Sequence, residues 1–272
     1  MATATTTAAP APLYWPLPPA LRHLSLDLAE MAALAALQPP ASLDVVSIGG
    51  GGAFFLPDER HNAAQNEVLE DDVEETECCY KVPAGCGTAM RGTAALLSGR
   101  MQERALTVCL LDSEWYWCLK GDAAPVGHAA WISELRPMGL RSLCLAQLAL
   151  EAGDMVQLAA AVPDLEELAL KICQLPPNAL PVLRHLPRLR RLEILGWDAY
   201  WPADLSEDAL QCQLLGLCAG EAGAPDLSLR FGADGEEFQE YLHFAIGWVQ
   251  QQLPPLRCHR RVEAEVVQFP LL

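Results

Sequence analysis

Features of membrane-bound, secreted and nucleic-acid-binding proteins are missing from this sequence. No apolar run reaches the roughly 18–20 residues that cross a bilayer. The N-terminus has no basic segment followed by an apolar one, so it does not resemble a secretory signal. Only 18 Lys and Arg stand against 35 Asp and Glu, for a net charge of −17, whereas phosphate binding needs a basic face. We expect a protein that binds neither membrane nor nucleic acid.

Motifs for metal binding and catalysis are also absent. The 10 cysteines include no Cys-x-x-Cys pair, and we expect reduced thiols in the cytoplasm or nucleus. The spacing of His61, Cys78, Cys79 and Cys86 fits no zinc-ligand rule. The glycines at 49–52 lack the Gly-Lys-Ser/Thr of a phosphate loop. The sequence predicts no catalytic residue, no cofactor and no metal, and a site assembled only in three dimensions stays open as an alternative.

What the sequence does have is a leucine phrase that recurs at nearly constant spacing. Its three copies begin 25 and then 24 residues apart. They are Leu140-x-x-Leu143-x-Leu145, Leu165-x-x-Leu168-x-Leu170 and Leu189-x-x-Leu192-x-Ile194. A fixed period in this range is typical of stacked structural units, each of which cannot bury its apolar face alone. An ordinary leucine-rich helical domain is the alternative.

One unit can be interpreted residue by residue. Leu168 and Leu170 point to one face of a strand, because successive side chains of a strand alternate. Cys173 follows as a small buried residue where the chain turns away. Residues 179–186 are apolar and predict a short helix that Pro187 ends. Strand, turn, helix and return thus fit within one period.

This unit resembles the leucine-rich repeat family, in irregular repeats of the ribonuclease-inhibitor-like or F-box-associated type. The family pattern, Leu-x-x-Leu-x-Leu-x-x-Asn/Cys-x-Leu, is met by Leu165, Leu168, Leu170, Cys173 and Leu175. The clear resemblance covers about residues 136–200, with Leu148 and Trp197 at the Asn/Cys position of the two flanking units. Weaker copies start at Leu21, Leu43, Leu106 and Leu227.

The resemblance implies an α/β solenoid of about seven units, with parallel strands on a concave face and short helices on a convex face. We expect residues 1–16 to be a flexible tail and residues 17–272 a single domain. An acidic insertion is expected at about 56–88, with seven acids among residues 67–77. Further expectations are a strand and then a helix over 21–38, a strand over 43–48, a helical segment over 90–104, and a helix ending at 218. An amphipathic helix over 235–253 and an edge strand over 262–266 would close the C-terminal end, at about 235–268.

A recognition surface would lie on the concave face, in rows of outward-facing strand residues. The candidate partner-binding residues are Ser142, Cys144, Glu167, Ala169, Lys171, Arg191, Glu193 and Leu195. Ala146 joins the third row, and the preceding unit was expected to contribute Val108, Leu110 and Asp112. Charges of both signs among small residues fit a protein partner better than a nucleic acid.

Two other clusters have simpler interpretations. The basic residues Arg184, His185, Arg188, Arg190 and Arg191 could dock an acidic partner, but pairing with the acidic insertion or with Glu167 is favoured. The aromatic residues of two irregular segments are expected to pack those segments down rather than form a binding site. They are Trp115, Tyr116, Trp117, Trp197, Tyr200 and Trp201.

The functional expectation is a non-enzymatic module, monomeric apart from a protein partner of unspecified identity. A cytoplasmic location is expected, with the nucleus and the ciliary axoneme as alternatives. Residues 17–21, Leu-Pro-Pro-Ala-Leu, are faintly similar to the opening of an F-box, so the substrate-recognition subunit of a ubiquitin ligase is one alternative function. An enzyme with an unrecognised site is the other.

Overall fold

The structure is a computed structural model, and it describes about three fifths of the chain. The described residues are 15–16, 23–27, 37–38, 43–49, 86–98, 101–109, 128–146, 148, 150–173, 175–176, 178–196, 207–218, 225–233, 236–252 and 261–268. Within them, parallel strands alternate with helices, which makes the protein α/β.

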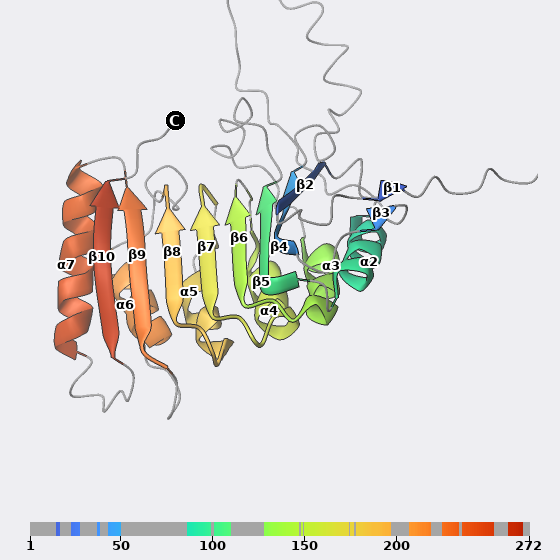
Figure 1. Ribbon diagram of the computed structural model, residues 1–272. Helices are drawn as coiled ribbons and strands as arrows, with labels where there is room; N and C mark the ends of the chain where they lie inside the picture. The colour runs from blue at the N-terminus through green and yellow to red at the C-terminus, as the bar shows by residue number, and fades with distance from the viewer. Residues whose placement is uncertain are drawn as a thin grey trace, which may run out of the picture.

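Eight strands form one parallel sheet in which every strand pairs with its neighbour in the chain (Figure 1). The strand order is β10-β9-β8-β7-β6-β5-β4-β2, so the described sheet runs in chain order without a reversal. The strands are β2 His23–Asp27, β4 Leu43–Gly49, β5 Met101–Cys109, β6 Ser142–Ala146, β7 Glu167–Lys171, β8 Arg191–Leu195, β9 Leu227–Ala233 and β10 Val262–Gln268. The short strands β1, Trp15–Pro16, and β3, Leu37–Gln38, pair separately.

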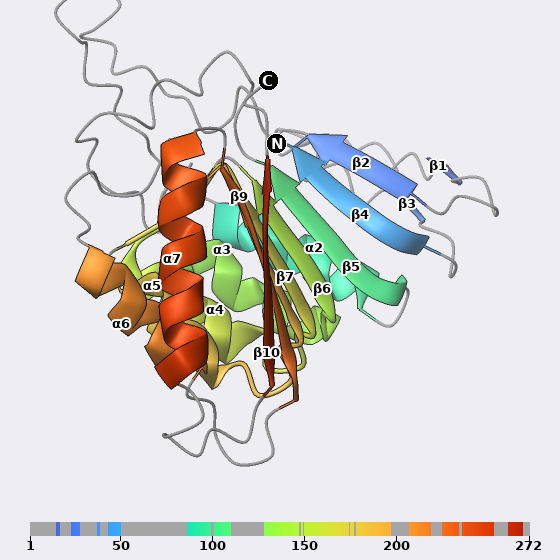
Figure 2. The same ribbon diagram turned by 90° about the vertical axis from the view of Figure 1, so that its left-hand side faces the viewer.

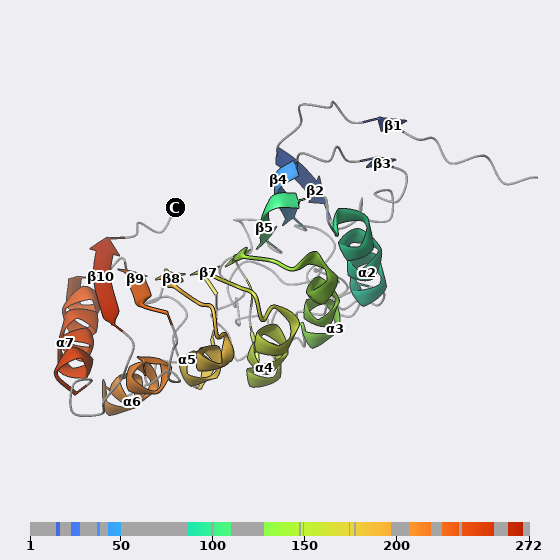
Figure 3. The ribbon, with the colours of Figure 1, turned by 60° about the horizontal axis from the view of Figure 1, so that its bottom comes forward.

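The helices connect these strands and lie on one face of the sheet, along the outside of its curve (Figure 3). They are α2 Cys86–Leu97, α3 Ala129–Ile132, η4 Ser133–Met138, α4 Ala152–Ala161, α5 Ala179–Val182, η5 Leu183–His185, α6 Glu207–Cys218 and α7 Glu236–Gln252. Seen from the C-terminal end, the helix layer stands to one side of the strands, and no described helix covers the other side (Figure 2).

The repeated leucines place the core between these two layers. Leu168 pairs in register with Leu143 on one side and with Leu192 on the other, so the period of 24 to 25 residues aligns equivalent leucines side by side. All three are at most 1% exposed. Side chains alternate along a strand, so these residues face the helices and their neighbours face away. The predicted α/β arrangement with parallel strands is therefore confirmed.

Several predicted elements are confirmed and three boundaries are corrected. The expected strand at 43–48 and the expected elements at the C-terminal end correspond to β4, α7 and β10, and β10 is an edge strand. Leu37 and Gln38 form strand rather than helix, because a proline at 39 disfavours helical backbone in the residue before it. Residues 101–104 belong to β5 rather than to a helix, since the helix ends at Leu97 before a glycine in the sequence.

The predicted tail and insertion fall mostly outside the described residues. Trp15 and Pro16, the last two residues of the expected tail, pair with β3. Cys86 begins α2, so the last three residues of the expected acidic insertion are helical. Residues 56–85, with the acidic run at 67–77, lie outside the described residues.

Candidate interaction face

The face of the sheet opposite the helices carries three rows of side chains, which we call the open face. Cross-strand register defines each row from β5 to β10. The first row is Ala105, Ser142, Glu167, Arg191, Ser228 and Glu263. The second row is Thr107, Cys144, Ala169, Glu193, Arg230 and Glu265. The third row is Cys109, Ala146, Lys171, Leu195, Gly232 and Val267.

All eight candidate residues lie on this face, in the rows expected for them. Glu167 and Arg191 are exposed, and most of the others are half-buried. Leu195 differs, because it is only 8% exposed.

The three residues expected from the preceding unit were wrong. Ala105, Thr107 and Cys109 occupy the β5 positions, while Val108 is fully buried among the core leucines. Leu110 and Asp112 lie outside the described residues. The error came from aligning Leu106 with the first leucine of the next phrase, whereas the register pairs it with Leu143. The better signal was the alternating pair Leu106 and Val108 itself.

Charge is unevenly distributed over the open face. Across β5 and β6 its described side chains are small and uncharged. Across β8 to β10 it carries a chain of ion pairs: Arg191 Nη2 lies 2.5 Å from Glu193 Oε1, and Arg230 Nη1 lies 3.6 Å from the same oxygen. Arg230 Nε lies 3.8 Å from Glu265 Oε2. Glu193 is thus held between two guanidinium groups, with its side chain 15% exposed.

The predicted basic cluster divides between different parts of the fold. Arg188 forms an ion pair with Asp164 at 3.0 Å, and Arg191 forms one with Glu193. Internal pairing therefore occurs, but with acids other than Glu167 and the acidic run. Arg184 and His185 lie in η5, in the helix layer, and Arg190 directly precedes β8. The cluster does not form one surface.

A buried polar cluster between α3 and α4 was not predicted. Trp131 Nε1 donates a hydrogen bond to His128 Nδ1 at 2.9 Å, and both side chains are at most 1% exposed. The Asp154 carboxylate accepts the backbone N–H of Glu151 at 2.9 Å and those of His128 and Ala129. It therefore ties the start of α4 to the start of α3, and its role is structural. Its partners lie far from it in the sequence, so no local pattern marked them.

Asp154 gives the stability of the fold a defined pH dependence. Burial raises the pKa of its carboxyl above the usual 3.8, and the backbone hydrogen bonds only partly oppose that rise. The folded protein therefore binds this proton more readily than the unfolded chain does. We expect the unfolding free energy of the wild type, relative to Asp154→Asn, to increase as pH falls from 7 through the raised folded pKa, and to level off below the unfolded pKa.

Chemical denaturation of both proteins between neutral and acidic pH measures this difference. A difference that decreases on acidification would contradict the assignment. At neutral pH, Asp154→Ala should lower the unfolding free energy by about 1–3 kcal/mol, because it leaves backbone donors without an acceptor.

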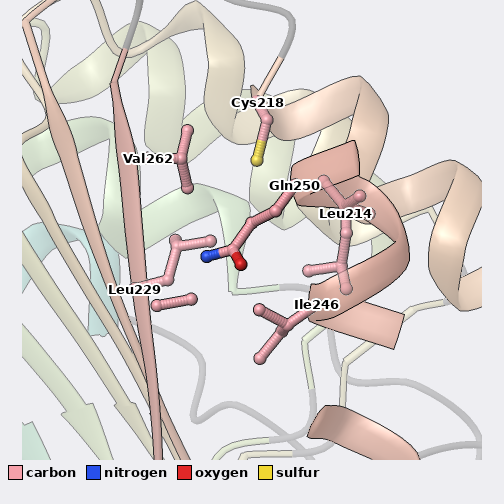
Figure 4. Close-up of a pocket in the computed structure, with 8 residues that line it drawn as sticks. Leu214, Cys218, Leu229, Ile246, Gln250 and Val262 are labelled. Carbon is pink, nitrogen blue, oxygen red and sulfur yellow. The ribbon is translucent and has the colours of Figure 1, made fainter. Parts of the chain in front are cut away.

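A small apolar cavity lies between α6, α7, β9 and β10 (Figure 4). Its volume is about 10 Å³, which is close to that of one water-sized probe. It is lined by Leu214, Cys218, Leu229, Ile246, Val249, Gln250, Val262 and Ala264. With mainly apolar walls, the cavity is a packing defect rather than a site for chemistry.

Filling this cavity should stabilise the C-terminal end of the protein. Val262 faces it from a strand, and Val262→Ile adds one methylene in a residue that suits strands (Figure 4). We expect the unfolding free energy to rise by about 0.8 kcal/mol. Thermal unfolding compared with Val267→Ile, on the opposite face of β10, separates filling from strand propensity. Equal gains in the two variants would refute the cavity explanation.

The structure describes no site for the other chemistry considered from the sequence. No described group of His, Cys, Asp and Glu could hold a metal ion. His61, Cys78, Cys79 and the six aromatic residues of the two irregular segments lie outside the described residues. Among the helices that are described, none has the length and apolarity needed to cross a membrane.

Comparisons with known proteins give no further assignment. No protein-family model, no curated protein and no solved structure matches this chain.

Proposed function

We propose that this protein is a non-enzymatic interaction module of the leucine-rich repeat type, and that it binds a protein partner through the open face. The observation that carries the proposal is a parallel sheet whose described helices all lie on one side (Figure 3). Parallel sheets in α/β proteins are normally covered on both faces. A face left without helices is available to a partner.

Burial of the consensus positions supports the repeat assignment. The five residues of the best-matching unit are all buried, at 0% to 7% exposure: Leu165, Leu168, Leu170, Cys173 and Leu175. The thiol of Cys173 donates to the carbonyl oxygen of Leu145 in the preceding unit, at 3.4 Å. A buried Cys that links one unit to the next has the role expected of the Asn/Cys position. The sequential strand order also favours a solenoid over a doubly wound sheet, where the order reverses.

The composition of the open face favours a protein partner over other ligands. Small side chains over β5 and β6 allow close approach, and the ion pairs over β8 to β10 provide charges of both signs. Such pairs are worth little in themselves at an exposed surface, so exchanging them for contacts with a partner costs little. Mixed charge also fixes the orientation in which a partner binds.

A charge-exchange experiment tests the proposal. Glu167 and Arg191 are direct cross-strand neighbours on the open face, and both are exposed. The double variant Glu167→Arg/Arg191→Glu keeps the net charge and the opportunity to pair, while reversing the pattern that a partner meets. We expect affinity purification of the intact protein, quantified by mass spectrometry, to show a specific companion reduced about tenfold or more, equivalent to 1.4 kcal/mol.

A matched control is available in the helix layer. Arg91 of α2 and Glu134 of η4 form a two-point ion pair at 2.6 and 3.0 Å, and the hydrogen bonds from Arg91 hold the pKa of the Glu134 carboxyl below its usual value. The variant Arg91→Glu/Glu134→Arg reverses an equivalent pair there. The companion should be retained in this control. If all three proteins recover the same companions in equal amounts, the open face is not the binding surface.

A further inference from the structure

A row of charged residues runs along the edge of the sheet at which β6, β7 and β8 begin, the lower edge in Figure 1. Backbone hydrogen bonds join its members in sequence: Arg141 N donates to Arg104 O at 2.9 Å, Glu166 N to Arg141 O at 2.8 Å, and Arg190 N to Glu166 O at 2.8 Å. These four residues therefore occupy consecutive rungs across β5 to β8. We call them the entry rim. It is distinct from the three rows of the open face.

The entry rim presents positive charge that the described residues do not neutralise. Arg104 and Arg190 are exposed, and neither has an ion-pair partner among the described residues. Arg141 is 58% exposed and is only 3.8 Å from Glu166, a loose contact. Three guanidinium groups in four rungs stand out in a chain with a net charge of −17.

Arg104 holds its position at a conformational cost. Its φ of 52° lies in the left-handed region, which favours glycine and disfavours residues with a Cβ. Its guanidinium lies against Gly139, since a Cβ built on that glycine would be 3.6 Å from Arg104 Nη1. A strained non-glycine residue is retained in a fold when something else depends on its side chain. Here the side chain supplies the first charge of the rim.

We propose that the entry rim binds an acidic, extended segment of a partner protein, with acidic side chains facing Arg104, Arg141 and Arg190 and a basic or neutral residue facing Glu166. Adjacent rungs of a sheet lie about 4.8 Å apart, so the rim spans about 15 Å, the reach of about five extended residues. Glu166 sets the pattern of the ligand. A nucleic acid carries a phosphate at every repeat and would place one against this carboxylate.

Fluorescence anisotropy with defined probes tests the proposal on the full chain. The probes are a labelled polyglutamate peptide of about eight residues, the same peptide with one central lysine, and an oligothymidylate of similar length. We expect the lysine-containing peptide to bind best and the oligothymidylate worst, with affinity falling as salt is raised.

Arg104→Gly separates a binding role from a structural one. It removes the guanidinium and also the backbone strain, so peptide affinity should fall about two- to fivefold. The melting temperature should stay the same or rise. Arg190→Ala should weaken the peptide similarly. Arg230→Gln removes one charge from the open face, away from the rim, and should leave peptide binding unchanged.

Each other outcome overturns the proposal. Absence of peptide binding up to about 1 mM would exclude the rim as a docking surface. Equal weakening by Arg230→Gln would mean that binding follows total charge rather than the rim. Oligothymidylate binding as tightly as the peptide, with the same loss in Arg104→Gly, would assign the rim to nucleic acid instead. Because the rim and open-face variants differ, either proposal can fail without the other.

Discussion

Leu168→Ala should lower the free energy of unfolding by about 3 kcal/mol, within the usual range of 2–5 kcal/mol for truncating a buried leucine. Leu168 is 1% exposed and lies in β7, with three further strands of the sheet on one side and four on the other. Its in-register neighbours, Leu143 and Leu192, are held in their own strands and cannot move far to close the void. Chemical denaturation measures the loss.

A control on the same strand isolates the effect of the buried face. Lys171 points to the open face, and Lys171→Ala should change the unfolding free energy by no more than about 0.5 kcal/mol. If the two variants lost similar stability, the assignment of the leucine rows to the core would be wrong, and with it the position of the open face.

Gly196→Ala should cost about 2 kcal/mol, although alanine is only one methyl group larger. Gly196 follows β8 with a φ of 79°, a conformation that costs a residue with a Cβ about 1–3 kcal/mol. The new Cβ would also lie 3.1 Å from Ile172 Cγ1 and 3.4 Å from Ile172 Cα, and the backbone atom cannot rotate away. Both effects act on the turn that leaves the strand, where Gly196 N donates to Gly232 O at 2.9 Å.

Gly153→Ala in α4 is the matched control. A Cβ at Gly153 would meet nothing within 4 Å, and helix interiors favour alanine over glycine. We expect this variant to gain about 0.5–1 kcal/mol in unfolding free energy. A double variant tests the cause at Gly196: Ile172→Gly removes the clashing side chain, so Ile172→Gly/Gly196→Ala should cost less than the two single changes added together. Strict additivity would exclude the contact with Ile172 as a cause.

The sequence predicted those parts of the fold that repeat locally. The alternating apolar pairs in β6, β7 and β8 placed the core and, by exclusion, all eight candidate residues on one face. Apolar periodicity also located α7, because every side chain of an amphipathic helix is specified within a few residues of its neighbours.

The sequence failed where distant residues or irregular backbone decide the structure. Leucine spacing did not encode the register shift between Leu43 and Val45 in the pairing of β4 with β5, so the open-face members of β5 were misplaced. The hydrogen bonds of Asp154 join segments that only the folded chain brings together, and the entry rim emerges only once the strands are aligned. Spacing along a chain cannot reveal such contacts, because each depends on where another segment ends.

The order of the strands has a consequence for how this protein can change over generations. Each strand pairs only with its neighbours in the chain, and equivalent positions in β6, β7 and β8 are 25 and 24 residues apart. Gain or loss of one such block of residues would add or remove one rung of the scaffold while leaving every remaining strand beside an equivalent neighbour. Unequal recombination could therefore alter the length of the surface without requiring a new topology.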